Sequence, residues 1–208
     1  TTETPAHLLG VTSSLPGEGK SMVVAHMAVS FAREGRRVLV VDADLRRPSQ
    51  HGLWGLGRDQ GLTSVLGGGV GLADAVQPTA IEGLQVLTSG PASEDPGRLV
   101  ESLKLRQLLL EAAKGWDVVL VDTPPVLLVN DAGVVGRVVD HLLLVVEAHG
   151  TSRRALKDAT ERLDLAGIKN IGMVLNRVRG SVSGHESYSR AARAYFRRVD
   201  EDVDEGVA

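Results

Sequence analysis

Cysteine is absent from this chain of 208 residues, and aromatic residues make up only 3% of it. Without cysteine the chain has no disulfide framework and no thiolate metal site, which agrees with a reducing cytoplasm. Since 43% of the residues are nevertheless hydrophobic, the core must be aliphatic. No apolar run approaches the ~20 residues that a membrane-spanning helix needs. The composition therefore predicts one globular domain that does not cross a membrane.

A strong charge imbalance is absent as well. The formal net charge is -3 and the sequence pI is about 6.1, so electrostatics give no reason to expect nucleic acid or an anionic bilayer as the main partner. The six histidines are scattered without the spacing of a zinc site, and we assign none to metal. The chain opens at Thr1 without a signal-peptide pattern, and we expect it to be part of a longer protein.

Short aliphatic runs alternate with stretches of helical period. This alternation predicts a parallel-rich central sheet with helices on both faces, an α/β fold. We expect a domain over residues 1–178 and a C-terminal tail over 179–208, with short helices and loops over 45–78. The expected strands are 7–11, 38–41, 84–87, 118–121, 142–146 and 171–175, and the expected helices are 20–34, 96–114 and 151–166.

A glycine-rich turn follows the first expected strand and leads into the first expected helix. Residues 10–21 have the P-loop pattern except that Ser14 stands where the strict motif has glycine. In a P-loop the backbone N–H groups cradle phosphates, Lys20 reaches the outer phosphates and the Ser21 hydroxyl binds Mg²⁺. The alternative is a glycine-rich turn before an ordinary helix. The predicted nucleotide contacts in this loop are Pro16, Gly17, Glu18, Gly19, Lys20, Ser21 and Met22.

Carboxylates end two of the other expected strands. Asp42 and Asp44 follow one strand and share a side of the extended chain, and Asp122 ends another in a Walker B pattern. Strand ends are where open α/β sheets bind ligands, and Mg²⁺ prefers a few protein oxygens together with phosphate and water. Ser21, Asp42 and Asp122 are therefore the predicted metal ligands. For the first pair of carboxylates, a turn with solvated charges is the alternative.

The three motifs together resemble those of a known family. The stretches 13–21, 41–48 and 121–125 are similar to the Walker A, A′ and B motifs of bacterial tyrosine kinases, the P-loop domains of tyrosine autokinases of capsular and exopolysaccharide synthesis. The resemblance extends over most of residues 7–178. It implies a P-loop NTPase fold and ATP- and Mg²⁺-dependent autophosphorylation on tyrosine, with ADP as product.

The resemblance also implies roles for individual residues. Lys20 would hold phosphates, Asp42 and Asp44 would act as metal ligand or base, and Arg46 would lie near the transferred phosphoryl group together with Arg47. These residues, Arg47 apart, are the predicted catalytic set. Near the adenine, the resemblance places Asn176, and we include its neighbour Arg177 in the predicted nucleotide site.

The family further implies partners and a location. They are a membrane-anchored chain-length-determinant adaptor domain in the same or a separate chain, a homo-oligomer when an N-terminal helix is present, a cognate tyrosine phosphatase and the inner face of the plasma membrane. The family's dense C-terminal tyrosine cluster is here reduced to Tyr188 and Tyr195. Both are predicted phospho-acceptors, although a shared helix face packed on the domain would equally explain their spacing.

Two other functions stay open. Switch ATPases of the ParA and MinD type carry a second lysine early in the loop, but this chain has no lysine from residue 10 to residue 19. A regulator that binds nucleotide without turnover would keep the same binding residues. Detecting label from ATP on tyrosine, as free phosphate or nowhere would separate the three functions.

Overall fold

The structure is a computed structural model, and it describes residues 7–178. Those residues form a seven-stranded sheet in the order β3-β4-β2-β5-β1-β6-β7. All neighbouring strands are parallel except the short pair β3 and β4, so the predicted parallel-rich α/β fold is confirmed. The strands are β1 (His7–Ser13), β2 (Val38–Asp42), β3 (Gln77–Pro78), β4 (Leu84–Leu87), β5 (Val118–Asp122), β6 (His141–Glu147) and β7 (Ile171–Asn176).

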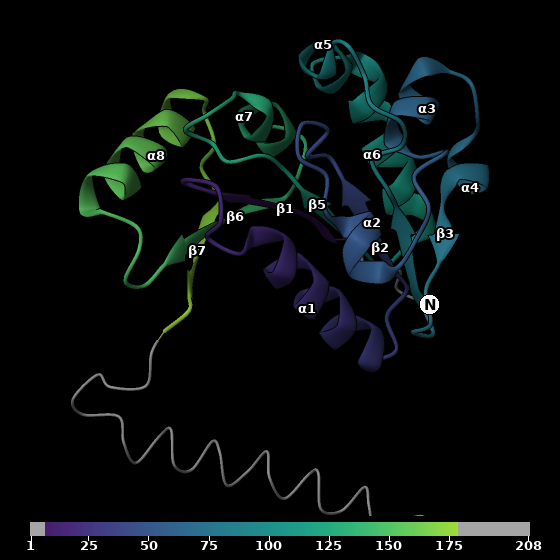
Figure 1. Ribbon diagram of the computed structural model, residues 1–208, viewed down its shortest axis with the longest axis horizontal. Coiled ribbons are helices and arrows are strands. Elements are labelled where there is room, and N and C mark those ends of the chain that lie inside the picture. Colours follow the sequence, from purple (N-terminus) through teal and green to yellow (C-terminus); the bar gives the residue numbers. More distant parts are fainter. Residues whose placement is uncertain (1–6, 179–208) are drawn as a thin grey trace, which may run out of the picture. The chain divides into compact units, whose positions relative to one another are not determined.

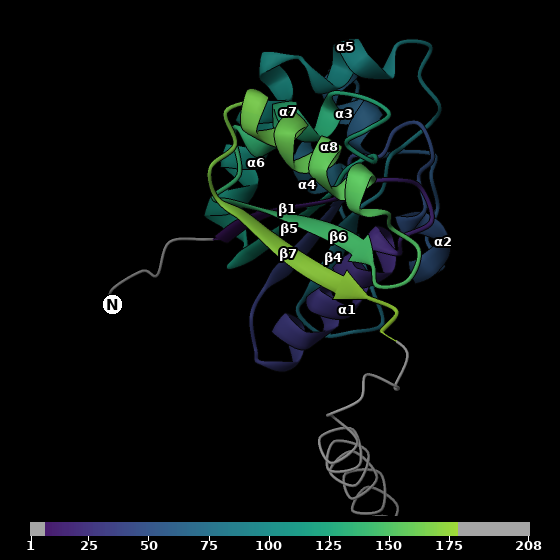
Figure 2. The same ribbon diagram turned by 90° about the vertical axis from the view of Figure 1, so that its left-hand side faces the viewer.

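Helices cover both faces of the sheet (Figures 1 and 2). On one face α1 (Lys20–Arg33) packs its small buried side chains against β2 and β5. On the other face lie α6 (Leu103–Gly115), α7 (Asp131–Gly136) and α8 (Arg153–Leu165). The remaining helices are short: α2 (Gln50–Trp54), α3 (Leu62–Gly67), α4 (Leu72–Ala75) and α5 (Pro96–Val100).

The core is aliphatic, as the composition predicts. β2 and β5 are buried along their whole length, which agrees with their unbroken runs of valine and leucine. Leu39 of β2 and Leu120 of the middle strand β5 are fully buried, one toward each helical layer. Burial of apolar surface on both sides holds the central strands rigidly, and their carboxyl ends are the part of the fold that carries the site.

The predicted helix over 96–114 is wrong in one respect, because it is two helices. α5 ends at Val100, and Ser102 interrupts the chain before α6 begins. The hydroxyl of Ser102 donates to the carbonyl of Leu99 (2.7 Å), and such a local bond competes with helix continuation. Pro96 follows Asp95, whose carboxylate accepts the N–H of Arg98 (3.1 Å) and caps the start of α5.

The predicted region of short helices and loops over 45–78 contains α2, α3, α4 and β3. Two elements, α7 and β3, have no counterpart in the sequence prediction. No helix within residues 7–178 is long and apolar enough to span a bilayer. The chain up to Asn176 forms one compact unit and Arg177 begins a second, most of which lies outside the described residues. The domain boundary at residue 178 stays a prediction.

Candidate phosphate and metal site

Three adjacent strands bring the predicted motifs to one edge of the sheet. β5 lies between β2 and β1, and Asp42 pairs in register with Asp122. Asp122 is also the register partner of Val11 on β1, two residues before that strand ends. Because parallel strands all end at the same edge, the P-loop and both aspartates meet although about 80 residues separate the latter.

The P-loop has a backbone that suits an anion. Gly17 and Gly19 have φ values of 85° and 90°, which only glycine adopts without strain. Gly19 is the N-cap of α1, and no described side chain caps that helix start, so its N–H groups and its positive end remain available to phosphate. The hydroxyl of Ser14 is buried without a partner among the described residues. These features fit a bound phosphate group.

Side chains from distant elements hold the loop in shape. One oxygen of the buried Glu18 carboxylate accepts the N–H of Leu15 (2.9 Å), and the other accepts the hydroxyl of Thr151. Asn176 donates its amide to the carbonyl of Glu18 (2.8 Å) and lies so close to Gly19 that a Cβ there would collide with it. The predicted nucleotide residue Asn176 is thus at the loop. Thr151 carried no sequence signal of this role.

The ammonium group of Lys20 lies between two carboxylates. Its Nζ is 2.9 Å from Asp44 Oδ2 and 3.0 Å from Asp122 Oδ1, and it donates to the hydroxyl of Ser21 at 3.2 Å. Burial alone would lower the pKa of Lys20, but the charges of Asp122 and Asp44 raise it above the ordinary value. Lys20 is therefore a fixed positive charge at the mouth of the P-loop.

Asp42 lies behind this ion cluster and caps α2. Its Oδ2 accepts the backbone N–H groups of Ser49 (3.1 Å) and Gln50 (3.0 Å), while its Oδ1 is buried without a partner among the described residues. Burial, and next the charge of Asp122, raise the pKa of Asp42 to about 7. Its second oxygen is an unsatisfied acceptor beside the cluster, which is what a cation or its water would meet.

Gln50 was not among the predicted residues. It is fully buried, and its amide donates to Asp122 Oδ2 (2.8 Å) and to the carbonyl of Ser21 (3.1 Å). The indole N–H of Trp54 donates to its amide oxygen (3.0 Å). Glutamine lies outside the usual carboxylate and lysine motifs, so only the three-dimensional structure reveals it.

Arg46 is paired with an aspartate of another element. Its guanidinium contacts both carboxylate oxygens of Asp131, at 3.3 and 3.4 Å, and Asp131 is buried at the start of α7. Arg47 donates its backbone N–H to Asp44 Oδ1 (2.9 Å), and its side chain is exposed. A two-point pair of this kind fixes the guanidinium plane, so Arg46 is held at the rim of the site.

The donor set fits a hard cation. Ser21 and Asp122 are both in contact with Lys20, and Mg²⁺ requires only one or two protein oxygens when phosphate and water complete its shell. Within residues 7–178 no cluster of three acidic or histidine side chains has the arrangement of an all-protein metal site.

The remaining predicted residues divide into exposed and undescribed ones. Pro16 and Met22 are exposed at the loop and at the start of α1, and their role as nucleotide contacts stays a prediction. Arg177 has a positive φ of 55° and belongs to the second unit of the chain. Tyr188 and Tyr195 lie outside the described residues, so their acceptor role stays a prediction.

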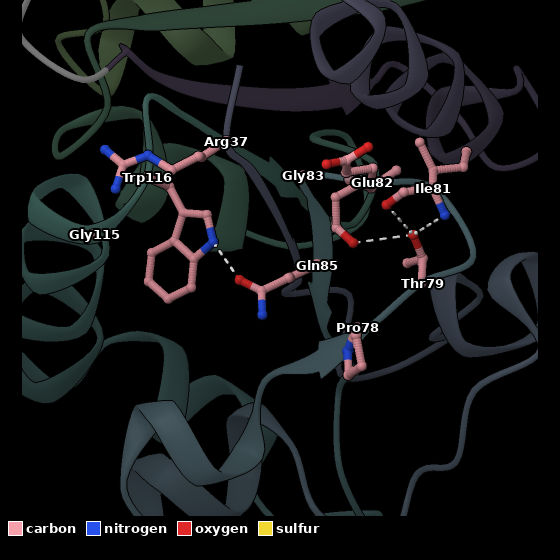
Figure 3. Close-up of a pocket in the computed structure, with 10 residues that line it drawn as sticks. Arg37, Pro78, Thr79, Ile81, Glu82, Gly83, Gln85, Gly115 and Trp116 are labelled. Carbon is pink, nitrogen blue, oxygen red and sulfur yellow. Dashed lines mark hydrogen bonds between the residues drawn. The ribbon is translucent and has the colours of Figure 1, made fainter. Parts of the chain in front are cut away.

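The described pockets lie at the opposite edge of the sheet. One of about 340 Å³ is lined at the amino ends of β2, β4 and β5 (Figure 3). There the indole N–H of Trp116 donates to the amide oxygen of Gln85 (2.9 Å). Its charged lining residues are Arg37 and Glu82, and Arg37 pairs with Asp117 where both side chains are accessible to solvent, so this cavity has none of the buried carboxylates found at the carboxyl edge.

Comparison with known proteins agrees with this geometry. Residues 10–202 match the family described as CobQ/CobB/MinD/ParA nucleotide binding domain. Over 178 residues the chain is 40% identical to tyrosine-protein kinase YwqD of Bacillus subtilis, covering 86% of this chain and 74% of that protein. The chain belongs to the bacterial tyrosine-kinase family.

Two solved structures place the chain further. The kinase domain of the Escherichia coli tyrosine kinase ETK has a TM-score of 0.78 at 35% identity, with 88% of this chain and 73% of that one covered. The septum site-determining protein MinD of Pyrococcus horikoshii, solved with Mg-ADP, has a TM-score of 0.72 at 25% identity, covering 85% and 72%. Against the tyrosine-protein kinase etk of Escherichia coli, the chain covers 26% of the relative at 36% identity. The bacterial tyrosine kinase is thus nearer than MinD in both measures.

Proposed function

We propose that this chain is an ATP- and Mg²⁺-dependent protein-tyrosine autokinase, which phosphorylates its own tyrosines. The observation that carries the proposal is Lys20, whose ammonium lies within 3.0 Å of both Asp44 and Asp122 at the mouth of the P-loop. Phosphoryl transfer depends on positioned charge more than on covalent chemistry. Membership of the tyrosine-kinase family supports tyrosine as the acceptor.

The described residues suggest how transfer proceeds. The acceptor hydroxyl oxygen forms a bond to the γ-phosphorus of ATP, and the bond from that phosphorus to the ADP oxygen breaks. Lys20 turns from its carboxylates toward the phosphate oxygens, and Asp44 then becomes available to accept the hydroxyl proton. Arg46, which is paired with Asp131, lies at the rim of the site, where it can bind the transferred phosphoryl group.

Mg²⁺ fits the same edge. Ser21 and Asp122 would hold it, with Asp42 accepting from its water shell. When bound, the ion neutralises charge on the phosphate oxygens. Gly17 and Gly19 keep the loop backbone turned toward the phosphates, and Asn176 packs against the loop at Gly19. We include Pro16, Glu18, Met22 and Arg177 in the nucleotide site.

The wider role follows from the family. We propose that the kinase regulates capsular or exopolysaccharide polymerisation and export at the cytoplasmic, inner face of the plasma membrane. It would act with a membrane-anchored chain-length-determinant adaptor in the same or a separate chain and form a homo-oligomer when an N-terminal helix is present, and a cognate tyrosine phosphatase would reverse the phosphorylation. Nucleic acid is not among the proposed partners. Tyr188 and Tyr195 are the proposed acceptors.

Labelled ATP tests the proposal. Incubation with Mg²⁺ should place label on tyrosine, and a Tyr188→Phe, Tyr195→Phe variant should bind ATP equally but remain unlabelled. Release of free phosphate without labelled tyrosine would instead support a switch ATPase, the second candidate favoured by the likeness to MinD. Neither label nor phosphate in an oligomer-competent protein would support a nucleotide-binding regulator.

A further inference from the structure

Gln50 is a buried amide that contacts three residues of the site, Asp42, Asp122 and Ser21. It begins α2, eight residues after Asp42, and its side chain is fully shielded from solvent. Its backbone N–H binds Asp42, its side-chain N–H groups bind Asp122 and the carbonyl of Ser21, and its amide oxygen accepts from Trp54. Burying such a group is costly unless its partners are all in place, and here they are.

Because of this amide, the two carboxylate oxygens of Asp122 have different partners. Asp122 Oδ2 receives the N–H of Gln50 at 2.8 Å, whereas Oδ1 faces the ammonium of Lys20 at 3.0 Å. With one oxygen held, the carboxylate cannot rotate, and Oδ1 stays turned toward the P-loop. Because the amide is neutral, it orients Asp122 without cancelling the negative charge that a cation needs.

Trp54 determines which way the amide points. An indole nitrogen can only donate, so the 3.0 Å contact from Trp54 requires the oxygen of Gln50 on that side. The N–H groups must then face Asp122 and Ser21. The hydrogen bonds therefore run in one direction, with Trp54 donating to Gln50 and Gln50 donating to Asp122. In this way α2 holds the carboxylate at the end of β5.

We infer that Gln50 is a positioning residue that sets the orientation of Asp122 and so the affinity of the site for Mg²⁺ with nucleotide. This inference rests on the proposed function and deepens it. Hydrogen-bond partners of metal-ligating carboxylates typically change metal affinity about 10- to 100-fold when removed. Gln50 is expected to fall in that range.

The test compares two glutamines that make the same bond to a tryptophan. Gln50→Met removes the amide at equal length, and Gln85→Met does the same at the far edge, where Gln85 accepts from Trp116. ADP affinity is measured in EDTA and across a Mg²⁺ titration, and thermal unfolding is recorded without nucleotide. Gln50→Asn, which keeps an amide but shortens it, decides the matter if the methionine variant does not fold.

For Gln50→Met we expect the half-saturating Mg²⁺ concentration to rise about tenfold or more, with ADP affinity in EDTA within twofold of wild type. Gln85→Met should leave both values unchanged. Equal losses with and without Mg²⁺ would show a merely structural role and overturn the inference. So would a Mg²⁺ dependence within twofold of wild type in the folded Gln50 variant. A wild-type chain whose ADP affinity ignores Mg²⁺ overturns the proposed function itself, and this inference with it.

Discussion

The amino and carboxyl edges of the sheet contain the same kinds of ion pair and hydrogen bond, but these bonds serve different purposes. Each has an ion pair to an aspartate and a glutamine that accepts from a tryptophan. At the amino edge Arg37 pairs with Asp117, and both side chains are well exposed, at 63% and 33%. At the carboxyl edge Lys20 faces Asp44 and Asp122, whose side chains are 4% and 0% exposed. Burial makes the second set costly and chemically potent, because a charge interacts more strongly where water is excluded.

Charge balance differs in the same way. At the amino edge Arg37 pairs with Asp117, and the charge of Arg36 also lowers the pKa of that carboxyl, so negative charge is not in surplus there. At the carboxyl edge the single ammonium of Lys20 contacts the carboxylates of both Asp44 and Asp122, and Asp42 lies behind them, near enough for the charge of Asp122 to raise its pKa. Surplus buried negative charge is energetically unfavourable, and a bound cation removes that cost by neutralising the charge. The comparison suggests that the carboxyl edge is built to be completed by a ligand, whereas the amino edge is complete as it stands.

Lys20→Met should break this contrast most severely. We expect phosphorylation to fall at least 100-fold, since the ammonium is the proposed phosphate contact. The chain should still fold, but with a lower melting temperature at pH 8, because two buried carboxylates lose their cation. Phosphotyrosine yield and thermal unfolding measure the two effects. Arg37→Met at the amino edge is the control, and it should change neither appreciably. Activity within threefold of wild type in Lys20→Met would refute the P-loop assignment.

Asp122→Asn tests the metal side of the same edge. Mg²⁺-dependent ADP affinity should fall about tenfold or more, while affinity in EDTA should change little, because the proposed role of Asp122 is metal ligation. Isothermal titration with and without Mg²⁺ distinguishes the two. Asp117→Asn serves as the matched change at the amino edge. If both titrations weakened equally, Asp122 would not be a metal ligand.

Asp42 should make stability depend on pH. Its pKa is raised to about 7 in the folded chain, so between pH 4 and 7 the folded state keeps a proton that the unfolded state releases. Stability then falls as pH rises through that window, and the cost of the charged form is fully present above it. Asp42→Asn in EDTA should therefore raise the melting temperature at pH 8 by roughly a few degrees and much less at pH 5.

Asp164→Asn is the control for that comparison. Asp164 is exposed, and its bond to Lys169 lowers its pKa, so its replacement should not stabilise the chain at either pH. A gain for Asp42→Asn that was equal at pH 5 and pH 8 would mean that the carboxyl group does not titrate in this window.

The sequence predicts well the aspartates at the strand ends. It predicts poorly the residues of other elements that hydrogen-bond to the site and hold it in place. Asp42 and Asp122 follow unbroken aliphatic runs, which mark buried parallel strands, and parallel strands must end at a common edge. Gln50 and Thr151 reach the site from a short helix and a distant loop. Their positions depend on long-range packing, which no local period encodes. The break between α5 and α6 was missed for a similar reason, since a single serine hydroxyl decides it.

The smallest expected effect sharpens the comparison furthest. Trp54→Phe and Trp116→Phe each remove one indole N–H from a glutamine oxygen, at the carboxyl and amino edge respectively. Each loss should cost stability about 1 kcal/mol, the usual net value of such a bond. Thermal unfolding should therefore not tell the two variants apart.

Mg²⁺ titration should separate them. Without its tryptophan partner the amide of Gln50 can turn over and present its oxygen to Asp122, which weakens the hold on that carboxylate. We expect the half-saturating Mg²⁺ concentration to rise about two- to fivefold in Trp54→Phe, less than in Gln50→Met because the amide can still donate part of the time. Trp116→Phe should match wild type, since Gln85 contacts no part of the phosphate site. Identical Mg²⁺ curves for the two variants would mean that Trp54 only packs against α2 and does not orient the amide.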